Sequence, residues 1–530
     1  KEILLPQNIF GTRSNSSGID FSEKQNLENL SVKLAKFKDK KINAESIYFG
    51  RNKSADRKFK ASSISSNIDM GTINFDDPKD IKDCLEKNNS NEWGKIDVKK
   101  RTEILNRVAD SIEKDPYELI FYLINEAGKT IQNAVDEIRE GVDFLRYYAE
   151  QALKIIEERE LEGPTGEENK ILYSPKGRFL CISPWNFPVA ILIGQISAAL
   201  SCGNKVIAKP SEHTSILGYL VVLKFHECGV PLSALELILG DGSYGDMLTK
   251  INSLQGVAFT GSLPTAKKIQ SNLIENQNQI VPLIAETGGI NSMLVDSSAL
   301  LEQVTDDVIR SAFDSAGQRC SALRVLCIQE EIYEELVEMI KGNMITQKIG
   351  DPNNFDTDIG PIITKQSIEK LNKYIDKCRE QNFDVFQTTK NTDDMHISPT
   401  LITINKISDI KNEQFGPILH LLKYKSNNTD KLINDINKTG YGLTMGIHSR
   451  IESRADYFGK QSNIGNIYIN RDMVGAVVGS QPFGGVGLSG SGFKAGGPNY
   501  LLQFLNEKVI SKNSVAFGGN TELLNLQEDL

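Results

Sequence analysis

The sequence predicts a doubly wound α/β protein that is divided into more than one domain. From residue 177 onward, short apolar runs alternate with helix-like stretches of roughly ten to fifteen residues, a rhythm typical of parallel strands joined by crossover helices. A second region with a similar rhythm extends from about residue 290 to residue 480. The chain has 530 residues, which is too long for a single hydrophobic core.

The segments before the first predicted sheet differ in composition. The first 75 residues are polar and rich in Lys, Asn and Ser, and they predict an extension or linker with one helix at about residues 23–37. Between residues 98 and 157, apolar side chains recur at positions i, i+3 and i+4. This spacing predicts amphipathic helices that cover a sheet.

Five apolar runs predict the strands of the first parallel sheet. In chain order they are "RFLCIS", "KVIAKP", "LELILG", "GVAFTG" and "IVPLIAE". Open parallel sheets bind ligands at the carboxyl ends of their strands. The residues that follow these runs are therefore the first candidates for a binding site.

Composition and charge exclude several classes of protein. The net charge is −9 and the pI is about 5.4, which disfavours binding to the phosphates of nucleic acids. The seven cysteines form no CxxC pair and the five histidines form no HExxH or comparable cluster, so we expect neither a disulfide framework nor a metal site. The longest strongly apolar run, residues 189–200, is too short to span a membrane. We expect a cytoplasmic protein and, because residue 1 is Lys, a processed product or a piece of a longer polypeptide.

Two predicted strand ends carry residues suited to a dinucleotide. Lys209 and Glu212 in "AKPSE" can reach a ribose diol, and the carboxylate of Glu212 would repel a 2′-phosphate and favour NAD over NADP. In "FTGS", residues 259–262, the turn and a helix that starts near Pro264 offer N–H groups to a pyrophosphate. "GDGSYG", residues 240–245, also matches GxGxxG, but no acidic residue follows where a ribose would need one. A glycine-rich turn is therefore the simpler interpretation of that stretch.

Glu286 and Cys320 are candidates for catalysis whose local sequence leaves alternatives open. Glu286 ends a predicted strand before two glycines in "AETGG", and it is either a charge at a surface turn or a general base. Cys320 in "SAGQRCSALR" is flanked by Arg319 and Arg324. A free thiol has a pKa of about 8.5 and needs cationic neighbours or a helix amino end to become a good nucleophile. The local sequence does not decide between a buried structural thiol and a nucleophile.

Six motifs considered together decide between these alternatives. "SPWNFP" (residues 183–188), "KPSE", "FTGS", "ETGG", "GQRC" and "EQFGP" (residues 413–417) occur in the order and at about the spacing of the aldehyde dehydrogenase superfamily. The chain resembles that superfamily from about residue 76 to residue 510. The resemblance implies an aldehyde dehydrogenase fold, with a doubly wound NAD-binding domain, an α/β catalytic domain and a small β-flap used in subunit contacts.

The resemblance also implies a role for each motif. Cys320 would attack the aldehyde as a thiolate, Asn186 and the Cys320 backbone N–H would form the oxyanion hole, and Glu286 would activate water. Local alternatives are a helix cap for Asn186 and core packing for Phe415. Phe415 would otherwise pack near the nicotinamide and Glu413 would bind its ribose. The whole expected NAD site comprises Ile182, Ser183, Pro184, Trp185, Lys209, Ser211, Glu212, Gly242, Gly245, Thr260, Gly261, Ser262, Gly288, Glu413 and Phe415.

A narrower resemblance connects the chain to proline utilization A, a group of bifunctional proteins in which a flavin-dependent proline dehydrogenase barrel precedes an aldehyde dehydrogenase half. It rests on "LLPQNIFGTRSNSSGIDF" (residues 4–21), "GQRCSALRVL", residues 469–498 and "AFGGNTELLNL" near the end. It implies oxidation of L-glutamate γ-semialdehyde, the open form of pyrroline-5-carboxylate, and a proline dehydrogenase domain in the same chain or as a partner. The expected substrate contacts are Phe187 and Phe483 around the aliphatic chain and Ser321, Gly475 and Ala476 around a carboxylate.

Two other functions stay open at this stage. One is a dehydrogenase of another semialdehyde, such as succinate semialdehyde, and the other is a catalytically silent scaffold of the same fold. The presence of Cys320, Glu286 and Asn186 disfavours the scaffold, and without the resemblance "GAVVG", residues 475–479, would be a tight turn.

The resemblance implies a division of the chain into five parts. We expect an N-terminal extension at 1–75, an NAD-binding domain at 76–160 and 181–288, a catalytic domain at 289–488, a β-flap at 161–180 and 499–512, and a C-terminal tail at 513–530. The flap predicts a homo-oligomer.

Overall fold

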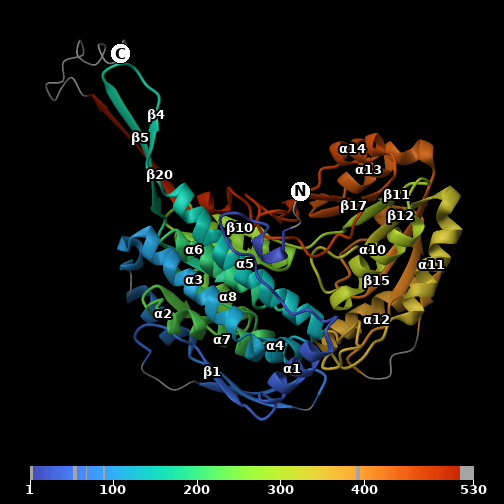
Figure 1. Cartoon of the computed structure of the whole chain (residues 1–530), viewed down its shortest axis with the longest axis horizontal. Coiled ribbons are helices and arrows are strands. Elements are labelled where there is room, and N and C mark those ends of the chain that lie inside the picture. The colour runs from blue at the N-terminus through green and yellow to red at the C-terminus, as the bar shows by residue number, and fades with distance from the viewer. Residues whose placement is uncertain (1–3, 52–55, 67, 88–89, 389–393, 514–530) are drawn as a thin grey trace.

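The computed structural model describes residues 4–51, 56–66, 68–87, 90–388 and 394–513. It consists of two α/β lobes side by side, with a narrow strand hairpin that protrudes from the first lobe (Figure 1). Residues 514–530 of the expected C-terminal tail lie outside the described residues. The predicted α/β class is confirmed, because each lobe is built on a mainly parallel sheet.

A five-stranded parallel sheet forms the centre of the first lobe, in the order β10-β9-β6-β7-β8. Its strands lie in the five apolar runs that the sequence analysis selected. Their bounds are β6 (Arg178–Ile182), β7 (Lys205–Lys209), β8 (Leu235–Leu237), β9 (Gly256–Thr260) and β10 (Leu283–Glu286). Most side chains of these strands are buried, as expected for a sheet covered on both faces.

In the described chain, eight helices accompany the strands of this sheet. They are α2 (Pro78–Lys87), α3 (Val98–Lys114), α4 (Tyr117–Asn125), α5 (Ile131–Ile155), α6 (Ala190–Ser201), α7 (Ser215–Glu227), α8 (Gly242–Leu248) and α9 (Leu263–Asn276). Helices α3, α5 and α6 pack against one another. Helix α6 is apolar on all sides and almost fully buried, which explains the long apolar run at 189–200.

The first 75 residues contain more regular structure than the sequence predicts. The expected helix is present as α1 (Lys24–Ala35), and it is followed by a three-stranded sheet of β1 (Ile42–Glu45), β3 (Asp69–Phe75) and β2 (Arg57–Ser62). Leu30, Ala44 and Phe75 belong to the hydrophobic core of the first lobe. Strand β2 buries only one of its six side chains, so its sequence carries little of the apolar alternation that predicts a strand.

The second lobe has a seven-stranded sheet in the order β13-β14-β15-β12-β11-β17-β18. Strand β13 pairs antiparallel with β14, and the other pairs are parallel. The strands are β11 (Ser292–Val295), β12 (Val325–Gln329), β13 (Val385–Gln387), β14 (Thr400–Ile404), β15 (Ile418–Tyr424), β17 (Thr444–His448) and β18 (Asn466–Ile469). The helices are α10 (Leu301–Phe313), α11 (Tyr333–Thr346), α12 (Lys365–Glu380), α13 (Thr429–Asn437) and α14 (Glu452–Gln461), and the short helix η4 (Asp314–Gly317) follows α10.

The protruding hairpin is an antiparallel sheet of β20 (Leu505–Asn513), β5 (Glu167–Pro175) and β4 (Arg159–Leu161), in that order (Figure 1). Strand β5 and all but the last residue of β20 lie in the two segments, 161–180 and 499–512, that the sequence analysis assigned to a β-flap. Strand β4 begins two residues before the first segment, and β6 of the first sheet begins within it. A further small sheet pairs β16 (Tyr441–Gly442) with β19 (Val486–Gly487).

The buried side chains form two hydrophobic clusters. The first contains residues from Leu30 to Ala285 and is completed by Val478 and by residues 500–505, whereas the second contains residues from Ile290 to Met473. We propose to divide the chain between residues 288 and 289, where the two clusters meet. Among the described helices, none is both long and apolar enough to cross a bilayer.

Candidate active site

The carboxyl ends of four parallel strands meet at one edge of the first sheet. Strand β6 ends at Ile182, β7 at Lys209, β9 at Thr260 and β10 at Glu286. The chain proceeds from β6 toward β8 on one side and from β9 toward β10 on the other, so the topological switch point lies between β6 and β9. Open α/β sheets bind ligands at such a point.

Cys320 follows a short stretch of left-handed backbone. Ser315, Ala316 and Gly317 have φ values of 53°, 54° and 66°. Side chains other than glycine rarely adopt this conformation, and it costs of order 1–3 kcal/mol for each of them. A Cβ at Gly317 would lie 2.3 Å from the backbone oxygen of Gly416, so this position requires glycine. The strained turn connects α10 to the loop that carries the cysteine.

Buried hydrogen bonds hold this loop in place. Nδ2 of Asn291 donates to the backbone oxygens of Cys320 and Ala322 at 2.7 and 2.9 Å. The fully buried guanidinium of Arg324 donates to three backbone oxygens of neighbouring loops at 2.8 to 3.2 Å and to a carboxylate oxygen of Glu413 at 3.3 Å. Cys320 is therefore fixed relative to both sheets.

Cys320 and Glu286 open into one cavity of about 110 Å³. Thr260 from the expected cofactor site also lines it, whereas the lining does not include Asn186. The cavity brings together all five predicted substrate residues, Phe187, Ser321, Gly475, Ala476 and Phe483.

The thiol of Cys320 is surrounded by carboxylates. Burial raises its pKa to about 12, and Glu413, Glu286 and Glu140 act in the same direction. The resting nucleophile is therefore a neutral thiol, which is the opposite of what two flanking arginines in the sequence would favour.

The flanking arginines are engaged elsewhere. Arg319 forms an ion pair with Asp314 at 2.7 Å and donates to the side-chain oxygen of Asn133. Arg324 is paired with Glu413. The local sequence suggested that these two cations could activate the thiol. They do not, because each positive charge is neutralised by its own carboxylate.

Glu286 is a buried acid rather than a charge at a surface turn. Its Oε2 accepts a hydrogen bond from the Gly485 backbone N–H at 3.0 Å, and its Oε1 has no hydrogen-bond partner among the described residues. Burial raises the pKa of Glu286 to about 8, although the Gly485 amide and Lys494 offset part of the effect. A carboxylic acid that titrates near neutral pH is suited to proton transfer.

Asn186 contacts the nucleophile loop. Its Nδ2 donates to the backbone oxygen of Gln318 at 3.0 Å, which leaves the second N–H of the amide for another acceptor. The alternative role as a helix cap is not found, because α6 has Val189 at its N-cap and no side-chain cap. The backbone N–H of Cys320 also donates to no acceptor within the described chain.

Residues 475–479, which we call the anchor loop, present free backbone donors. The loop is bounded by Gly475 with φ 72° and Gly479 with φ 83°. Val477 donates its N–H to Gln481 at 3.2 Å, whereas the N–H groups of Gly475 and Ala476 have no acceptor in the described residues. Gly475 and Ala476 line the cavity, and two adjacent amides without acceptors beside a cavity are suited to bind a carboxylate.

The two predicted aromatic contacts are held differently. Two cations lie close to the ring of Phe187, with Lys129 Nζ 3.9 Å and Arg319 Cζ 5.2 Å from its centroid. Phe483 is held through its backbone, which exchanges two hydrogen bonds of 2.9 Å with Ala495. Both rings line the cavity with Cys320.

The residues after β7 that were expected to bind a ribose make hydrogen bonds within the protein. The buried ammonium of Lys209 donates to the backbone oxygens of Gly240 at 2.8 Å and Pro210 at 3.2 Å. Ser211 caps the short helix that contains Glu212. The glycine-rich stretch forms the start of α8, with Gly242 as its first residue and Gly245 beside the Lys209 stem. Lys209 therefore braces this turn.

The helix that the sequence predicts near Pro264 is present after β9. Gly261 donates its N–H to the backbone oxygen of Glu286 at 3.0 Å. Ser262 caps α9, and Pro264 occupies its first turn. The amino end of α9 therefore starts at the same sheet edge as the cavity.

A group of predicted cofactor residues packs together beside Cys320. Trp185 and Phe415 meet edge to face with centroids 5.7 Å apart. A Cβ on Gly288 would lie 1.8 Å from Glu413 Oε2, so only glycine allows this carboxylate its position. Ile182 and Pro184 are half-buried at the end of β6, and Ser183 is buried with an unpartnered hydroxyl among the described residues.

Among the residues of the site that the sequence analysis did not select are Glu140 and Gln195, which line the cavity, and Asn291, which holds the loop of Cys320; Arg324 was considered only as a cation beside the thiol. Glu140 lines the cavity without a hydrogen bond from any described residue, and burial with the nearby Glu137 raises its pKa to about 7. The available signal was a set of acidic residues at 137, 140 and 143, spaced by three along one face of the amphipathic helix α5, on which Glu137 and Asp143 are buried. Acidic side chains on a buried helix face are rare unless they have a function or a partner.

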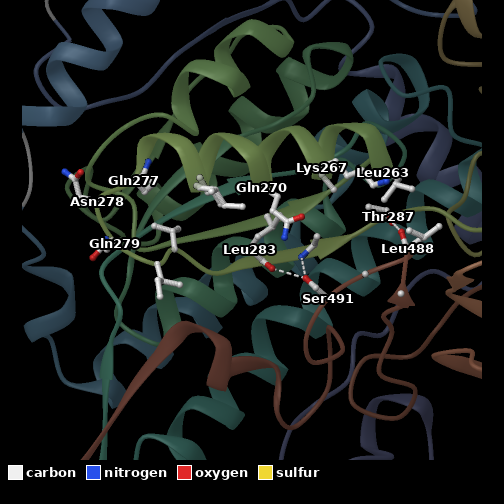
Figure 2. Close-up of a pocket in the computed structure, with 18 residues that line it drawn as sticks. Leu263, Lys267, Gln270, Gln277, Asn278, Gln279, Leu283, Thr287, Leu488 and Ser491 are labelled. Atoms are coloured by element: carbon white, nitrogen blue, oxygen red, sulfur yellow. Dashed lines mark hydrogen bonds between the residues drawn. The ribbon is translucent and has the colours of Figure 1, made fainter.

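A larger groove of about 760 Å³ lies outside this cavity, along α9 (Figure 2). Leu263, Lys267 and Gln270 line it from the helix, and Ser491 lies opposite, where its hydroxyl donates to the Leu283 backbone oxygen at 2.9 Å (Figure 2). The groove opens on the face of the first lobe beyond β10.

Comparison with known proteins assigns the family. A sequence profile described as the aldehyde dehydrogenase family matches residues 52–510. The chain therefore belongs to the aldehyde dehydrogenase family, and the resemblance of the six motifs is confirmed.

Two groups of relatives match almost the whole chain. The "Bifunctional protein PutA" of Klebsiella aerogenes is 40% identical over 97% of this chain, but the match covers 40% of the relative, so the chain spans less than half of that protein. The "1-pyrroline-5-carboxylate dehydrogenase" of Oceanobacillus iheyensis is 31% identical over 93% of this chain and 98% of the relative. The chain is similar to both.

Solved structures give the same result for the fold. A crystal structure of a bifunctional proline utilization A protein has a TM-score of 0.88 at 38% identity, and it covers 97% of this chain and 50% of that one. A mutant of the 1-pyrroline-5-carboxylate dehydrogenase of Thermus thermophilus has a TM-score of 0.88 at 27% identity, with 94% and 99% coverage.

Proposed function

We propose that the chain is a cytoplasmic NAD-dependent dehydrogenase that oxidises L-glutamate γ-semialdehyde to L-glutamate. The observation that carries this proposal is a single cavity in which Cys320 and Glu286 share walls with the free amides of Gly475 and Ala476. A nucleophile, a base and a carboxylate anchor are the groups that oxidation of a carboxylate-bearing aldehyde requires. Relatives named 1-pyrroline-5-carboxylate dehydrogenase support the same substrate.

The first chemical step takes place at Cys320. The sulfur attacks the carbonyl carbon, the S–H proton passes to solvent as the S–C bond forms, and the carbonyl oxygen becomes an oxyanion. The second N–H of the Asn186 amide and the Cys320 backbone N–H stabilise this oxyanion, because both donors are free and neither titrates. Since the pKa of the thiol is about 12, it stays protonated until an aldehyde is present.

The second step releases the acid. Bound NAD would supply the hydride acceptor for this step: collapse of the oxyanion would expel a hydride from the thiohemiacetal carbon and leave a thioester on Cys320. Glu286 then takes a proton from water while the water oxygen attacks the thioester carbon. As the C–S bond breaks, the departing sulfur takes the proton held by Glu286, so the acid leaves and both the thiol and the base are regenerated.

The residues at the sheet edge fit a nicotinamide dinucleotide. The amino end of α9, capped by Ser262, is suited to a pyrophosphate, and the hydroxyl of Ser183 is buried without a partner among the described residues. Glu413 and Phe415 are held next to Cys320, where the ribose and the nicotinamide would lie. We propose NAD rather than NADP because Glu212 would repel a 2′-phosphate.

The charges of the cavity favour a zwitterionic aldehyde. The anchor loop supplies donors for a carboxylate, and Glu140 supplies an unpaired carboxylate that is suited to an ammonium group. Glutamate semialdehyde has both groups, whereas succinate semialdehyde has only the carboxylate. Glu140 therefore favours the first substrate over the second.

The specificity constants of the two semialdehydes test this proposal. We expect glutamate semialdehyde to be preferred, and Glu140→Gln to reduce that preference about tenfold, because a hydrogen bond to a charged group is lost. Asp136→Asn, a carboxylate at the surface of the same helix, is the matched control and should leave the preference unchanged. A preference for succinate semialdehyde would refute the substrate, and no reduction of NAD with any semialdehyde would favour the silent scaffold.

We also propose a homo-oligomer. Ile274 and Ile280 in the α9 groove are 77% and 101% exposed, and Val509 on the flap is 54% exposed. Large apolar side chains at such exposure mark an association surface. The mass from light scattering should be a multiple of 58.8 kDa, and Ile274→Asp together with Ile280→Asp should reduce it. A monomer before substitution would refute the proposal.

A proline dehydrogenase domain, in the same chain or as a separate protein, is the proposed source of the aldehyde. The similarity to bifunctional PutA proteins supports it. Turnover of proline by a cell extract that contains this chain, and loss of glutamate formation when Cys320 is replaced by Ala, would test it.

A further inference from the structure

The N-terminal segment that contains Arg13 crosses helix α5 and reaches the anchor loop. It belongs to "LLPQNIFGTRSNSSGIDF", residues 4–21, a stretch that the proposed chemistry leaves without a role. In Figure 1 the N-terminal part of the described chain lies near the junction of the two lobes.

Arg13 connects this segment to the backbone of the anchor loop. Its Nη2 donates to the backbone oxygen of Val478 at 3.1 Å, and its Nη1 lies 3.4 Å from a carboxylate oxygen of Glu150 on α5. The guanidinium also lies 3.7 Å from the ring centroid of Phe10 and 4.9 Å from that of Tyr147. The side chain is 9% exposed, so these contacts are shielded from water.

The segment is itself anchored to a rigid part of the first lobe. Ser16 donates its backbone N–H and its hydroxyl to Asp143 at 2.7 and 2.9 Å. The backbone N–H of Ser17 donates to Glu113 at 2.9 Å. Helices α3 and α5 are long and pack on each other, so the backbone next to Arg13 is held in place by its hydrogen bonds to them.

The contact point on the loop faces the cavity. Val478 lines the same cavity as Gly475 and Ala476. The backbone of Val478 is therefore continuous with the stretch of cavity wall that contains the two free amides. A Cβ at Gly479 would lie 2.6 Å from Arg13 Nη2 and 3.0 Å from the ring of Tyr147, which means that the loop packs directly on the arginine. A shift of Arg13 would therefore move the anchor.

We propose that Arg13 is a positioning residue that holds the anchor loop in the conformation that binds the substrate carboxylate. This inference rests on the proposed function, in which that carboxylate is bound by Gly475 and Ala476. It makes the N-terminal segment a determinant of substrate specificity, although the segment contacts neither Cys320 nor Glu286 in the described structure. The effect is confined to aldehydes that carry a carboxylate.

The test compares Arg13→Met, Arg13→Lys and the control Lys24→Met in the full chain. Met keeps the apolar contact with the two rings but removes the hydrogen bond and the charge, and Lys keeps the charge. Lys24 is 88% exposed in the same part of the chain, and among the described residues it forms an ion pair only with Glu28, at 3.6 Å. The substrates are glutamate semialdehyde, succinate semialdehyde and propanal, which has no carboxylate.

For Arg13→Met we expect KM for both semialdehydes to rise about tenfold, with kcat, the KM for propanal and the Kd for NAD unchanged. Arg13→Lys should recover part of the loss, and Lys24→Met should behave like the unmodified protein. An equal loss for propanal and the semialdehydes would mean that Arg13 only supports folding, and unchanged KM values would mean that the loop does not depend on it. Either result would overturn the proposal.

The same data separate this inference from the proposed function. If the unmodified protein prefers propanal to both semialdehydes, the proposed function fails before any variant is considered, and the role of Arg13 fails with it. If the unmodified protein prefers the semialdehydes and Arg13→Met does too, to the same degree, only the role of Arg13 fails.

Discussion

Replacing Glu286 by Gln tests the central step of the proposed reaction, the hydrolysis of the thioester. Burial raises the pKa of Glu286 from 4.5 to about 8, a difference that corresponds to about 5 kcal/mol against ionisation in the site. About a tenth of the molecules then carry the ionised base at pH 7 and half of them at pH 8. Hydrolysis by the unmodified protein should therefore accelerate about fivefold from pH 7 to pH 8 and about twofold more above that.

The assay is rapid mixing of protein, NAD and semialdehyde with detection of the reduced cofactor. The first turnover forms one equivalent of reduced cofactor before hydrolysis begins, so Glu286→Gln should keep this burst. Its steady-state rate should fall by about 10²–10⁴, the usual contribution of a general base, and should lose the dependence on pH. Mass spectrometry should find the acyl group on Cys320 of the variant.

The stability of the protein gives a second measurement that does not depend on substrate. Because the folded pKa of Glu286 is raised, the stability that the neutral acid contributes is fully present below pH 4.5 and is lost as the pH rises through about 8. Glutamine has no such dependence. The Tm of Glu286→Gln minus that of the unmodified protein should therefore increase between pH 5 and pH 8 and then level off.

Glu275→Gln, an exposed glutamate on α9, is the matched control and should change neither measurement. A steady-state rate of Glu286→Gln within about threefold of the unmodified protein would refute the role of Glu286. Loss of the burst would mean that Glu286 is needed for thioester formation and not for the hydrolysis that follows it.

Three further predictions concern other groups. Cys320→Ala should abolish dehydrogenase activity without changing the Kd for NAD, and any remaining turnover of semialdehyde would refute the nucleophile. Glu212→Gln should raise kcat/KM with NADP relative to NAD about tenfold, and an unchanged ratio would exclude Glu212 from ribose recognition. Burial lowers the pKa of His420 and of His448 to about 4, so the stability of the neutral rings is present above pH 6.5 and is lost as the pH falls through 4. Thermal unfolding should therefore show a Tm that falls from pH 6.5 to pH 4, and His420→Gln should flatten that dependence.

The sequence predicted the first sheet well because its strands are buried on both faces. A continuous apolar run such as "GVAFTG" can be recognised without knowledge of its partners, and Ser262 and Pro264 mark the helix that follows. The N-terminal sheet was missed because β2 exposes five of its six side chains and resembles a polar linker. Its stability comes from β3, on which it packs, and such support is invisible in the local sequence.

The sequence motifs predicted which residues form the site, but not the backbone conformation or the charges that surround them. Ser315 and Ala316 adopt left-handed backbone although neither is glycine, so no residue preference marks the turn. The pKa of Cys320 depends on carboxylates that lie far from it in the sequence, and the nearest charges in the sequence are those of two arginines. The nearest charges in the sequence therefore suggest a lowered pKa for the thiol, whereas its pKa is raised.

The arrangement of charge around Cys320 would explain why the proposed anchor for a carboxylate consists of backbone amides. A free arginine beside the thiol would bind a carboxylate strongly, but it would also lower the pKa of Cys320 and expose a reactive thiolate to oxidation in the absence of substrate. In this structure Arg319 is neutralised by Asp314, and Arg324 by Glu413. The amides of the anchor loop offer donors without a formal charge, so the cavity can bind an anionic substrate while the thiol stays protonated.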